Sequence, residues 1–211
     1  MPRTFLDHIA ITAFSLEAGA ALVADTLGVE TQRGGEHPRM ATHNRLLRLG
    51  ESIYLEVIAP NPAARSPGRP RWFGLDTLAP HALPALSAWV VRSTDIQASA
   101  AAASEPLGDL EPMRRSALDW LITIPADGSV PLEGAAPALI QWHADAHPAA
   151  RMEDKGCALA LLEIFHPDPE RISRLLSSLE LEAPVAVRQA GPGDPVRLAA
   201  HIDTPHGRRI L

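Results

Sequence analysis

The stretch LDHIAITAFSLEAGAALVADTLGVE, Leu6 to Glu30, has the pattern of a strand followed by a helix. Its first residues form an apolar run, and from Leu16 onward apolar residues recur at i, i+4, i+7 and i+11, which is the spacing of one helix face. Gly28 follows where a helix commonly ends in the left-handed conformation. The segments VETQRGG, THNRLLRLG and SIYLEVIAP come next and have the composition of short strands. Together these segments predict a βαβββ module over residues 4–60.

The same order of strand and helix occurs twice more along the chain. LSAWVVRSTDIQASAAAASEPLG begins a second module over residues 85–148, and ALALLEIFHPDPERISRLLSSLEL begins a third, complete or partial, over residues 157–211. Each predicted helix begins after a residue that favours the N-cap position, namely Ser15, Asp95 or Asp168. The Pro- and Gly-rich residues 61–84 lack periodicity and are interpreted as a connector. We expect a single domain of class α+β, with a tight hairpin at Gly50-Glu51.

Composition narrows the class of protein. With 211 residues and 46% apolar content the chain can bury a core of ordinary size. No apolar run is long enough to span a membrane and the first residues lack a signal-peptide pattern, so we expect a cytoplasmic protein without a membrane partner. A net charge of −6 without a Lys/Arg block argues against a nucleic-acid partner. Cys157 is the only cysteine, so any metal must be bound by histidine and oxygen ligands.

The motifs LDHIAI, GGEHPRMATHNRLLRLG, YLEVIAP, RWFGLD, WVVR, LDWLITIP, LIQWH and FHPDPERI, taken in this order, resemble the glyoxalase and vicinal oxygen chelate superfamily. Within it the chain is similar to the glyoxalase-like domain family that is typical of bacteria. The resemblance implies that paired modules form a curved, partly open mixed β-barrel around a cavity, with a ligand or metal on the concave face. It also implies a homodimer, because modules of this superfamily often pair across chains.

The resemblance also implies where a metal would bind. In metalloenzymes of the superfamily the ligands come from the first and fourth strands of each module, and those positions are His8 and Glu56 in the first module. In the second module they are Ala88 and Gln141, so only half of the ligand set is present. Side chains alternate along a strand, so His8 and Glu56 meet if their strands are neighbours. A third ligand would come from Gln141, from water, or from one of two further histidines, His43 and His143.

Two interpretations of His8 and Glu56 therefore stay open. The first is a weakly bound divalent ion, Zn, Ni, Fe or Mn, and the second is a hydrogen-bonded pair in a polar cavity without metal or other cofactor. The ion would be held by one imidazole and one carboxylate, whereas a catalytic metal usually has three protein ligands.

Further candidates lie in the segment GGEHPRMATHNRLL and in the second module. His37 and Asn44 are predicted to bind a ligand at the cavity mouth, and His43 is the candidate catalytic base, since a histidine titrates near neutral pH. The alternative is a solvated hairpin loop. In the second module Trp89, Gln141 and Trp142 are predicted to bind the ligand, the two tryptophans as aromatic walls of the pocket, although tryptophans in strands also occur as plain core.

These observations indicate a protein that acts on a small molecule in a concave cavity. The resemblance implies metal-assisted chemistry of the lyase, isomerase or dioxygenase type, with Glu56 and His43 as catalytic residues. The alternative is a metal-free protein that binds or sequesters an apolar compound, as some relatives in the superfamily do with antibiotics. The metal content of the purified protein distinguishes the two.

Overall fold

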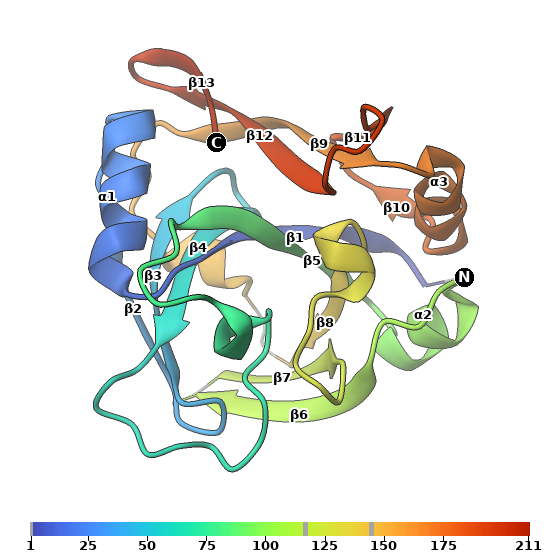
Figure 1. Ribbon diagram of the computed structural model, residues 1–211, viewed down its shortest axis with the longest axis horizontal. Helices are drawn as coiled ribbons and strands as arrows, with labels where there is room; N and C mark the ends of the chain where they lie inside the picture. The colour runs from blue at the N-terminus through green and yellow to red at the C-terminus, as the bar shows by residue number, and fades with distance from the viewer. Residues whose placement is uncertain (1, 116–117, 144–145) are drawn as a thin grey trace.

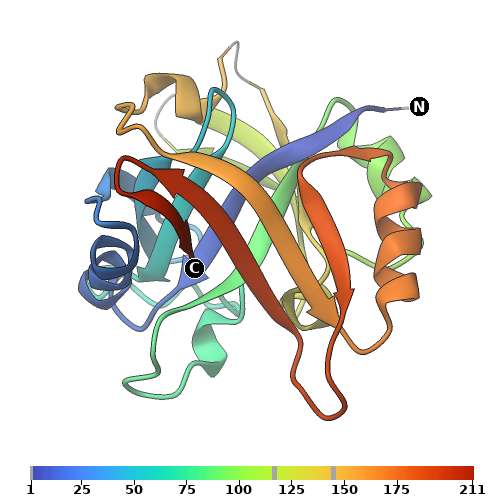
Figure 2. The same cartoon turned by 90° about the horizontal axis from the view of Figure 1, so that it is seen from above.

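The computed structural model describes residues 2–115, 118–143 and 146–211. Two β-sheets pack against each other, and the helices lie at their sides (Figure 1). The larger sheet is strongly curved and has the strand order β2-β3-β4-β1-β5-β8-β7-β6. The short strand β10 pairs with the N-terminal end of β1. The smaller sheet has the order β11-β9-β12-β13 and lies diagonally across β1 and β5 (Figure 2). The predicted α+β class with a curved, partly open barrel is confirmed.

The elements follow one another in the predicted order. The larger sheet is built from β1 (Thr4–Thr12), β2 (Gln32–His37), β3 (Thr42–Arg48), β4 (Tyr54–Pro60), β5 (Ala85–Ser93), β6 (Asp109–Arg115), β7 (Leu118–Ile124), β8 (Ala138–Trp142) and β10 (Leu181–Glu182). The smaller sheet is built from β9 (Ala158–His166), β11 (Val185–Gln189), β12 (Arg197–Thr204) and β13 (Gly207–Ile210). The α-helices are α1 (Leu16–Leu27), α2 (Ile96–Ala102) and α3 (Pro169–Ser178), and the 3-10 helices are η1 (Leu75–Thr77), η2 (Pro131–Gly134) and η3 (Pro148–Arg151).

The N-caps fix where the α-helices begin. Ser15, Asp95 and Asp168 each accept a hydrogen bond from the backbone N–H three residues later, as the sequence predicted. Gly28 ends α1 with φ 69°, a conformation that glycine adopts without a steric cost. No helix among the described residues is long and apolar enough to cross a membrane.

The centre of the larger sheet is the antiparallel pair β1 and β5, the first strands of the first two predicted modules. On one side β4 lies parallel to β1, and on the other β8 lies parallel to β5. Each half of the sheet therefore repeats the other, and the curvature brings the outer strands β2 and β6 toward each other. The sheet thus encloses a concave face that is built from both halves of the chain.

The two faces of the larger sheet differ in what they pack against. The convex face packs on the smaller sheet and on the helices through residues such as Ile9, Val57 and Trp89, which are fully buried or nearly so. Burying each of these side chains contributes about 1.5–3 kcal/mol of hydrophobic stabilisation. On the concave face the connector of residues 61–84 folds back over the sheet, where Trp72 and Phe73 are buried. The concave face is therefore partly roofed by the connector.

One predicted turn is wrong. The connection between β3 and β4 is longer than the two residues Gly50-Glu51, because the ladder continues only to a backbone bond from Leu49 N–H to the carbonyl of Ile53. Gly-Glu lacks the residue types that favour a two-residue hairpin, which explains the longer loop.

Candidate functional site

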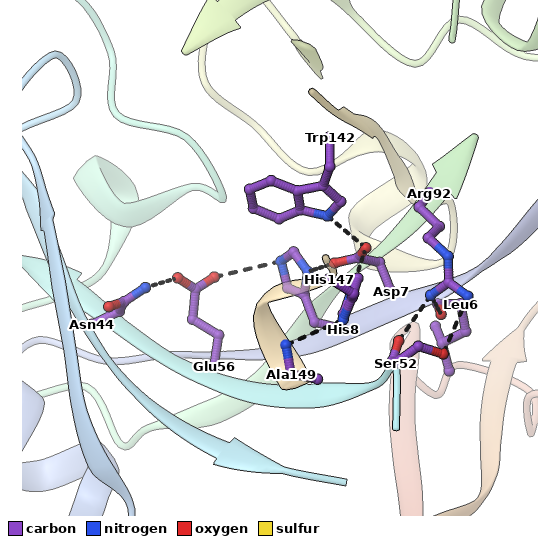
Figure 3. Close-up of polar contacts among 10 residues, drawn as sticks. All are labelled: Leu6, Asp7, His8, Asn44, Ser52, Glu56, Arg92, Trp142, His147 and Ala149. Atoms are coloured by element: carbon purple, nitrogen blue, oxygen red, sulfur yellow. Dashed lines mark hydrogen bonds and ion pairs between the residues drawn. The ribbon is translucent and has the colours of Figure 1, made fainter. Parts of the chain in front are cut away.

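Asp7 and His8 both serve the concave side because β1 contains a bulge in which Asp7 is the extra residue. In the pairing of β1 with β5, Leu6 lies opposite Val91 and His8 lies opposite Val90, so Asp7 has no partner of its own. An extra residue of this kind interrupts the alternation of side chains along a strand. Consequently the carboxylate of Asp7 reaches the ring of His8 instead of pointing to the opposite face (Figure 3).

Asp7 is fully buried and accepts hydrogen bonds from three rings. Nδ1 of His8 lies 2.6 Å from Oδ1, and Oδ2 lies 2.8 Å from Nε1 of Trp142 and 2.9 Å from Nε2 of His147 (Figure 3). Burial by itself raises the pKa of the Asp7 carboxyl, but the hydrogen bonds from His147 and His8 and their charges outweigh it and hold the pKa well below its usual range. Asp7 is therefore a carboxylate, and all three rings must donate to it.

The direction of these bonds fixes which ring nitrogens carry protons. The backbone N–H of Ala149 donates to Nδ1 of His147 at 3.2 Å, so the ring proton of His147 is on Nε2 and points to Asp7. Because Asp7 is an acceptor only, Nδ1 of His8 carries a proton as well. Nε2 of His8 is then the nitrogen that is left for chemistry in the cavity.

The ring of His8 is held between β1 and β4. It stacks on the ring of Tyr54 with the centroids 4.5 Å apart and the planes inclined by 17°. Burial and the charges of Asp7 and Glu56 raise the pKa of Tyr54 well above its usual value, so the phenol stays protonated. Nε2 of His8 lies 3.6 Å from Oε2 of Glu56. The expected proximity of His8 and Glu56 is therefore observed.

Glu56 is held in turn by Asn44 on β3. Nδ2 of Asn44 donates to Oε1 of Glu56 at 2.5 Å, while Oδ1 of Asn44 accepts from the backbone N–H of Gly35 at 2.7 Å. A Cβ atom at Gly34 would lie 2.0 Å from Oδ1 of Asn44 and 2.8 Å from its backbone oxygen. The Gly-Gly pair of the motif GGEHP thus leaves the space that the amide of Asn44 needs to orient Glu56. Oε2 of Glu56 remains directed at His8.

These side chains lie in a cavity on the concave face that contains about 420 Å³ of empty space, part of it open to solvent. Ligand pockets of proteins commonly have a few polar groups on mostly apolar walls, and this cavity has that composition. Its lining consists of His8, His37, Asn44, Leu46, Tyr54, Glu56, Trp72, Phe73, Arg115, Trp120, Ile122, Ile140, Trp142 and Pro148. A small, mostly apolar cavity beside it shares Trp72, Phe73 and Ile122 with it. The polar site therefore borders an apolar one.

His37 lies in the cavity wall as a neutral ring. Its Nε2 faces a guanidinium nitrogen of Arg115 at 3.2 Å, and because arginine can only donate, Nε2 accepts. Nδ1 is 3.2 Å from Oγ1 of Thr42. Burial and the charge of Arg115 lower the pKa of His37 from 6.5 to about 3. His37 is thus an acceptor for Arg115 and is not available as a base or metal ligand through Nε2.

The neutral His37 should make the protein less stable in mild acid. The unfolded chain binds a proton at this position below pH 6.5, whereas the folded protein does not until about pH 3. Stability therefore falls as the pH is lowered between these values, by about 1.4 kcal/mol per pH unit. Urea unfolding of the wild type and of His37→Gln between about pH 4 and pH 6 should give slopes that differ by roughly this amount. Parallel slopes would show that His37 is protonated in the folded state.

Three of the predicted site residues do not line this cavity. His43 lies on the other face of β3, near Glu17 of α1. Trp89 packs in the convex-face core, donates from Nε1 to the carbonyl of Ala135 and lines the neighbouring apolar cavity. Gln141 accepts from the backbone N–H of Ile96 at 2.8 Å and so faces α2. His43 and Gln141 are thus placed outside the polar cavity, and Trp89 borders the apolar cavity beside it.

The physical reason is the alternation of side chains along each strand. Asn44 and Trp142 line the cavity, so their chain neighbours His43 and Gln141 face away from it. The register of β5 with β8 gives the equivalent positions in the second module. There Val90 pairs with Ala138, as Ala10 pairs with Glu56 in the first module. The second-module counterpart of Glu56 is thus Ala138 and not Gln141.

Some residues of the site were missed in the sequence. Asp7 stands next to His8 in LDHIAI, but a regular strand would direct it to the opposite face, so only the bulge makes it part of the site. His147 comes from the loop before η3, and the one signal in its sequence is the His-Pro pair, which is typical of a helix start. Arg115 lies at the end of β6, far from the motif GGEHP that it contacts, and no local pattern identifies it.

The donor atoms fall short of a catalytic metal site. His8 Nε2 and Glu56 Oε2 both face the cavity, but the amide oxygen of Asn44 is bound to Gly35 and Nε2 of His37 is bound to Arg115. Across the described residues no three His, Cys, Asp or Glu side chains are grouped so that they could hold one ion. A well-held catalytic metal usually has three protein ligands. The residues present supply two, and the chemistry proposed below is carried by side chains.

We therefore expect the purified protein to contain no stoichiometric metal unless it is supplemented. Chelator should leave the melting temperature unchanged, because an ion stabilises a fold only in proportion to how far its concentration exceeds its dissociation constant. Elemental analysis and melting curves with and without chelator measure both quantities. Zinc, nickel or iron bound in a one-to-one ratio would contradict this prediction and show that a further residue completes the site.

Comparisons with known proteins show the family and the fold. A family model described as a glyoxalase-like domain matches residues 6–180. The structure of a hypothetical protein from Staphylococcus aureus has a TM-score of 0.57 at 11% sequence identity, with 98% of this chain and 84% of that chain covered. A methylmalonyl-CoA epimerase in complex with methylmalonyl-CoA and NH4+ has a TM-score of 0.46 at 18% identity, with 69% and 99% covered. The Streptomyces coelicolor epimerase gives 0.44 at 18% identity, with 68% and 97% covered. A search of curated proteins gave no match.

Proposed function

Because the chain belongs to the glyoxalase-like domain family, as its motifs predicted, we propose that it is an enzyme that moves a proton at a carbon next to a carbonyl group. The substrate is a small molecule bound in the concave cavity, and Glu56 and His8 are the proton-transfer pair. One observation carries the proposal: Nε2 of His8 and Oε2 of Glu56 face each other at 3.6 Å inside a largely buried cavity. Hydrogen bonds orient both groups: His8 donates to Asp7, and Glu56 accepts from Asn44.

The pair suits acid–base chemistry because one proton lies between two atoms that can each carry it. With the proton on Nε2, Glu56 is a carboxylate and His8 an imidazolium whose Nδ1–H is bound to Asp7. The substrate binds beside the pair on the cavity side, so that its acidic carbon faces Glu56 and its carbonyl oxygen faces His8. Positioned acid and base groups contribute about 10² to 10⁴-fold to such reactions.

The reaction has two steps. Glu56 removes the proton, the electron pair of the broken C–H bond forms a C=C bond, and the carbonyl π pair moves to oxygen, where Nε2–H of His8 stabilises the enolate by a hydrogen bond. Protonation of the same carbon on its opposite face, or of the adjoining carbon, completes an isomerisation, whereas departure of a group with its bonding electrons from the next carbon completes an elimination. The proposal is thus an isomerase or lyase that works with the side chains present.

The aromatic walls support a second candidate function. Trp72, Trp120 and Trp142 line the cavity, and the small apolar cavity borders it. Walls of this kind also suit a protein that binds and sequesters an apolar compound without changing it. In that case the His8–Glu56 pair would have a structural role, in which each polar group compensates for the burial of the other.

Hydrogen exchange distinguishes the two functions. The wild-type protein is incubated in D2O with a panel of small carbonyl compounds, and deuterium uptake at the carbon next to the carbonyl is followed by NMR. The proposal expects enzyme-dependent uptake in at least one compound. A panel member that binds, as seen by saturation transfer, but takes up no deuterium would favour sequestration.

A further inference from the structure

A groove lined by arginines leads into the cavity. It runs from Arg115 outward between β2 and the segment around η3, and it shares Leu46, Arg115 and Pro148 with the cavity lining. Arg33 and Arg151 lie farther along it, and Arg114 lies beside it. Such a collection of cations is unexpected in a chain with a net charge of −6. Among the described residues of the groove lining, Glu36 is the one acidic side chain.

The charges of this groove are not neutralised by the described part of the chain. Some arginines elsewhere form ion pairs, as Arg39 and Arg69 do with Glu111. Arg33, Arg115 and Arg151 have no carboxylate of a described residue within ion-pair distance. Arg33 and Arg151 are exposed, whereas Arg115 is half-buried, and a half-buried guanidinium without a counter-ion is costly unless a ligand supplies the charge.

Arg115 is placed where it can serve a ligand and the cavity together. Its side chain packs on the backbone of Gly35, where a Cβ atom would lie 3.0 Å from Cδ and 3.1 Å from a guanidinium nitrogen. One N–H donates to the neutral His37, which cannot offset the positive charge. The remaining N–H groups of the planar guanidinium suit the two oxygens of a carboxylate or phosphate.

We propose that the substrate carries a carboxylate or phosphate group that binds in this groove between Arg115, Arg33 and Arg151. This inference rests on the proposed function, because it places the reacting end of the same molecule beside His8 and Glu56. The shared lining at Leu46 and Arg115 places groove and cavity next to each other. The anionic group gives affinity and orientation at the mouth, and the carbonyl end reaches the proton-transfer pair.

Anion binding tests the proposal without knowledge of the substrate. Pyrophosphate and succinate are titrated separately at constant ionic strength, and the amide signals of Gly34 and Gly35 are followed by ¹⁵N NMR. We expect saturable shifts with a Kd of about 1 mM for at least one probe. A preference for pyrophosphate would identify the group as a phosphate, and a preference for succinate as a carboxylate.

Variants locate the binding to the groove. Arg115→Gln should raise the Kd at least about tenfold, and Arg151→Gln, which alters an exposed residue, should raise it by a smaller factor. Arg174→Gln removes the same charge from an exposed position on α3 and should leave the Kd unchanged within about twofold. Equal Kd values for Arg115→Gln, Arg151→Gln and the wild type, or no saturable shift up to about 20 mM probe, would overturn the proposal.

One further variant separates this inference from the proposed function. Glu56→Gln should still bind the anions with the Kd of the wild type, since Glu56 does not line the groove. A protein that binds the probes in the groove but exchanges no substrate hydrogen would retain the anion site and lose the proposed reaction. Hydrogen exchange at the substrate without anion binding in the groove would support the proposed reaction and overturn the anion site.

Discussion

Glu56→Gln should slow hydrogen exchange at the substrate carbon about 10³-fold while the protein stays folded. The amide has the shape of the carboxylate, and its oxygen can still accept the hydrogen bond from Asn44. It cannot take up a proton from carbon, so the variant removes the base and little else. A buried carboxylate costs desolvation free energy. We therefore expect the fold to tolerate its replacement in a functional cavity. Exchange rates by NMR and a melting curve measure the two effects separately.

The chain offers a matched control for this variant. Glu163 on β9 accepts from Nε2 of His201 at 2.7 Å, so it is a second Glu–His pair, but it lies on the smaller sheet, outside the cavity. Glu163→Gln should leave the exchange rate unchanged. If Glu56→Gln exchanges at the wild-type rate, Glu56 is not the base. If it instead unfolds at a much lower temperature, the His8–Glu56 pair is structural.

Asp7→Ala should be the most destabilising change in the site, by about 3–5 kcal/mol. It leaves Nδ1 of His8, Nε1 of Trp142 and Nε2 of His147 without their acceptor at a position where Asp7 is fully buried. Each unsatisfied buried donor costs about 1–3 kcal/mol. Urea unfolding of the variant and wild type gives the difference. Asp119→Ala, which removes the exposed partner of Arg114, should cost less than about 1 kcal/mol.

Asp7→Asn separates the structural from the positioning role of Asp7. The amide oxygen can accept from Trp142 and His147, while the amide N–H can donate to Nδ1 of His8 if the ring proton of His8 moves to Nε2. We expect this variant to be more stable than Asp7→Ala and to show the Nε2–H form of His8 by ¹⁵N NMR. A stability loss as large as that of Asp7→Ala, with the ring proton still on Nδ1, would mean that Asp7 does not set the protonation of His8.

Periodicity in the sequence predicted the order of strands and helices, and the resemblance to the glyoxalase superfamily implied the curved, partly open barrel. The helix starts at Ser15, Asp95 and Asp168 depend on local hydrogen bonds, so they are readable from neighbouring residues. The loop between β3 and β4 was mispredicted because its Gly-Glu pair says little about turn length.

Only part of the candidate site could be predicted. The alternation of side chains along a strand explains both the residues that were found and those that were not. His8 and Glu56 were found because regular alternation places them on one face of neighbouring strands. Gln141 was assigned as the counterpart of Glu56, a position that Ala138 holds, because without the register of β5 and β8 the sequence does not say which residue of β8 occupies it. Asp7 was missed for the opposite reason, since a bulge breaks the alternation just before His8. Long-range contacts such as that of Arg115 with Gly35 leave no local signal.

The most direct test of the account is a crystal structure of the Glu56→Gln variant with a compound whose hydrogen the wild type exchanges. The account predicts that the exchanging carbon lies within about 3.5 Å of the side chain at position 56 and that the carbonyl oxygen lies within hydrogen-bond distance of Nε2 of His8. A compound bound with its exchanging carbon turned away from both side chains, or seated outside the concave cavity, would contradict it.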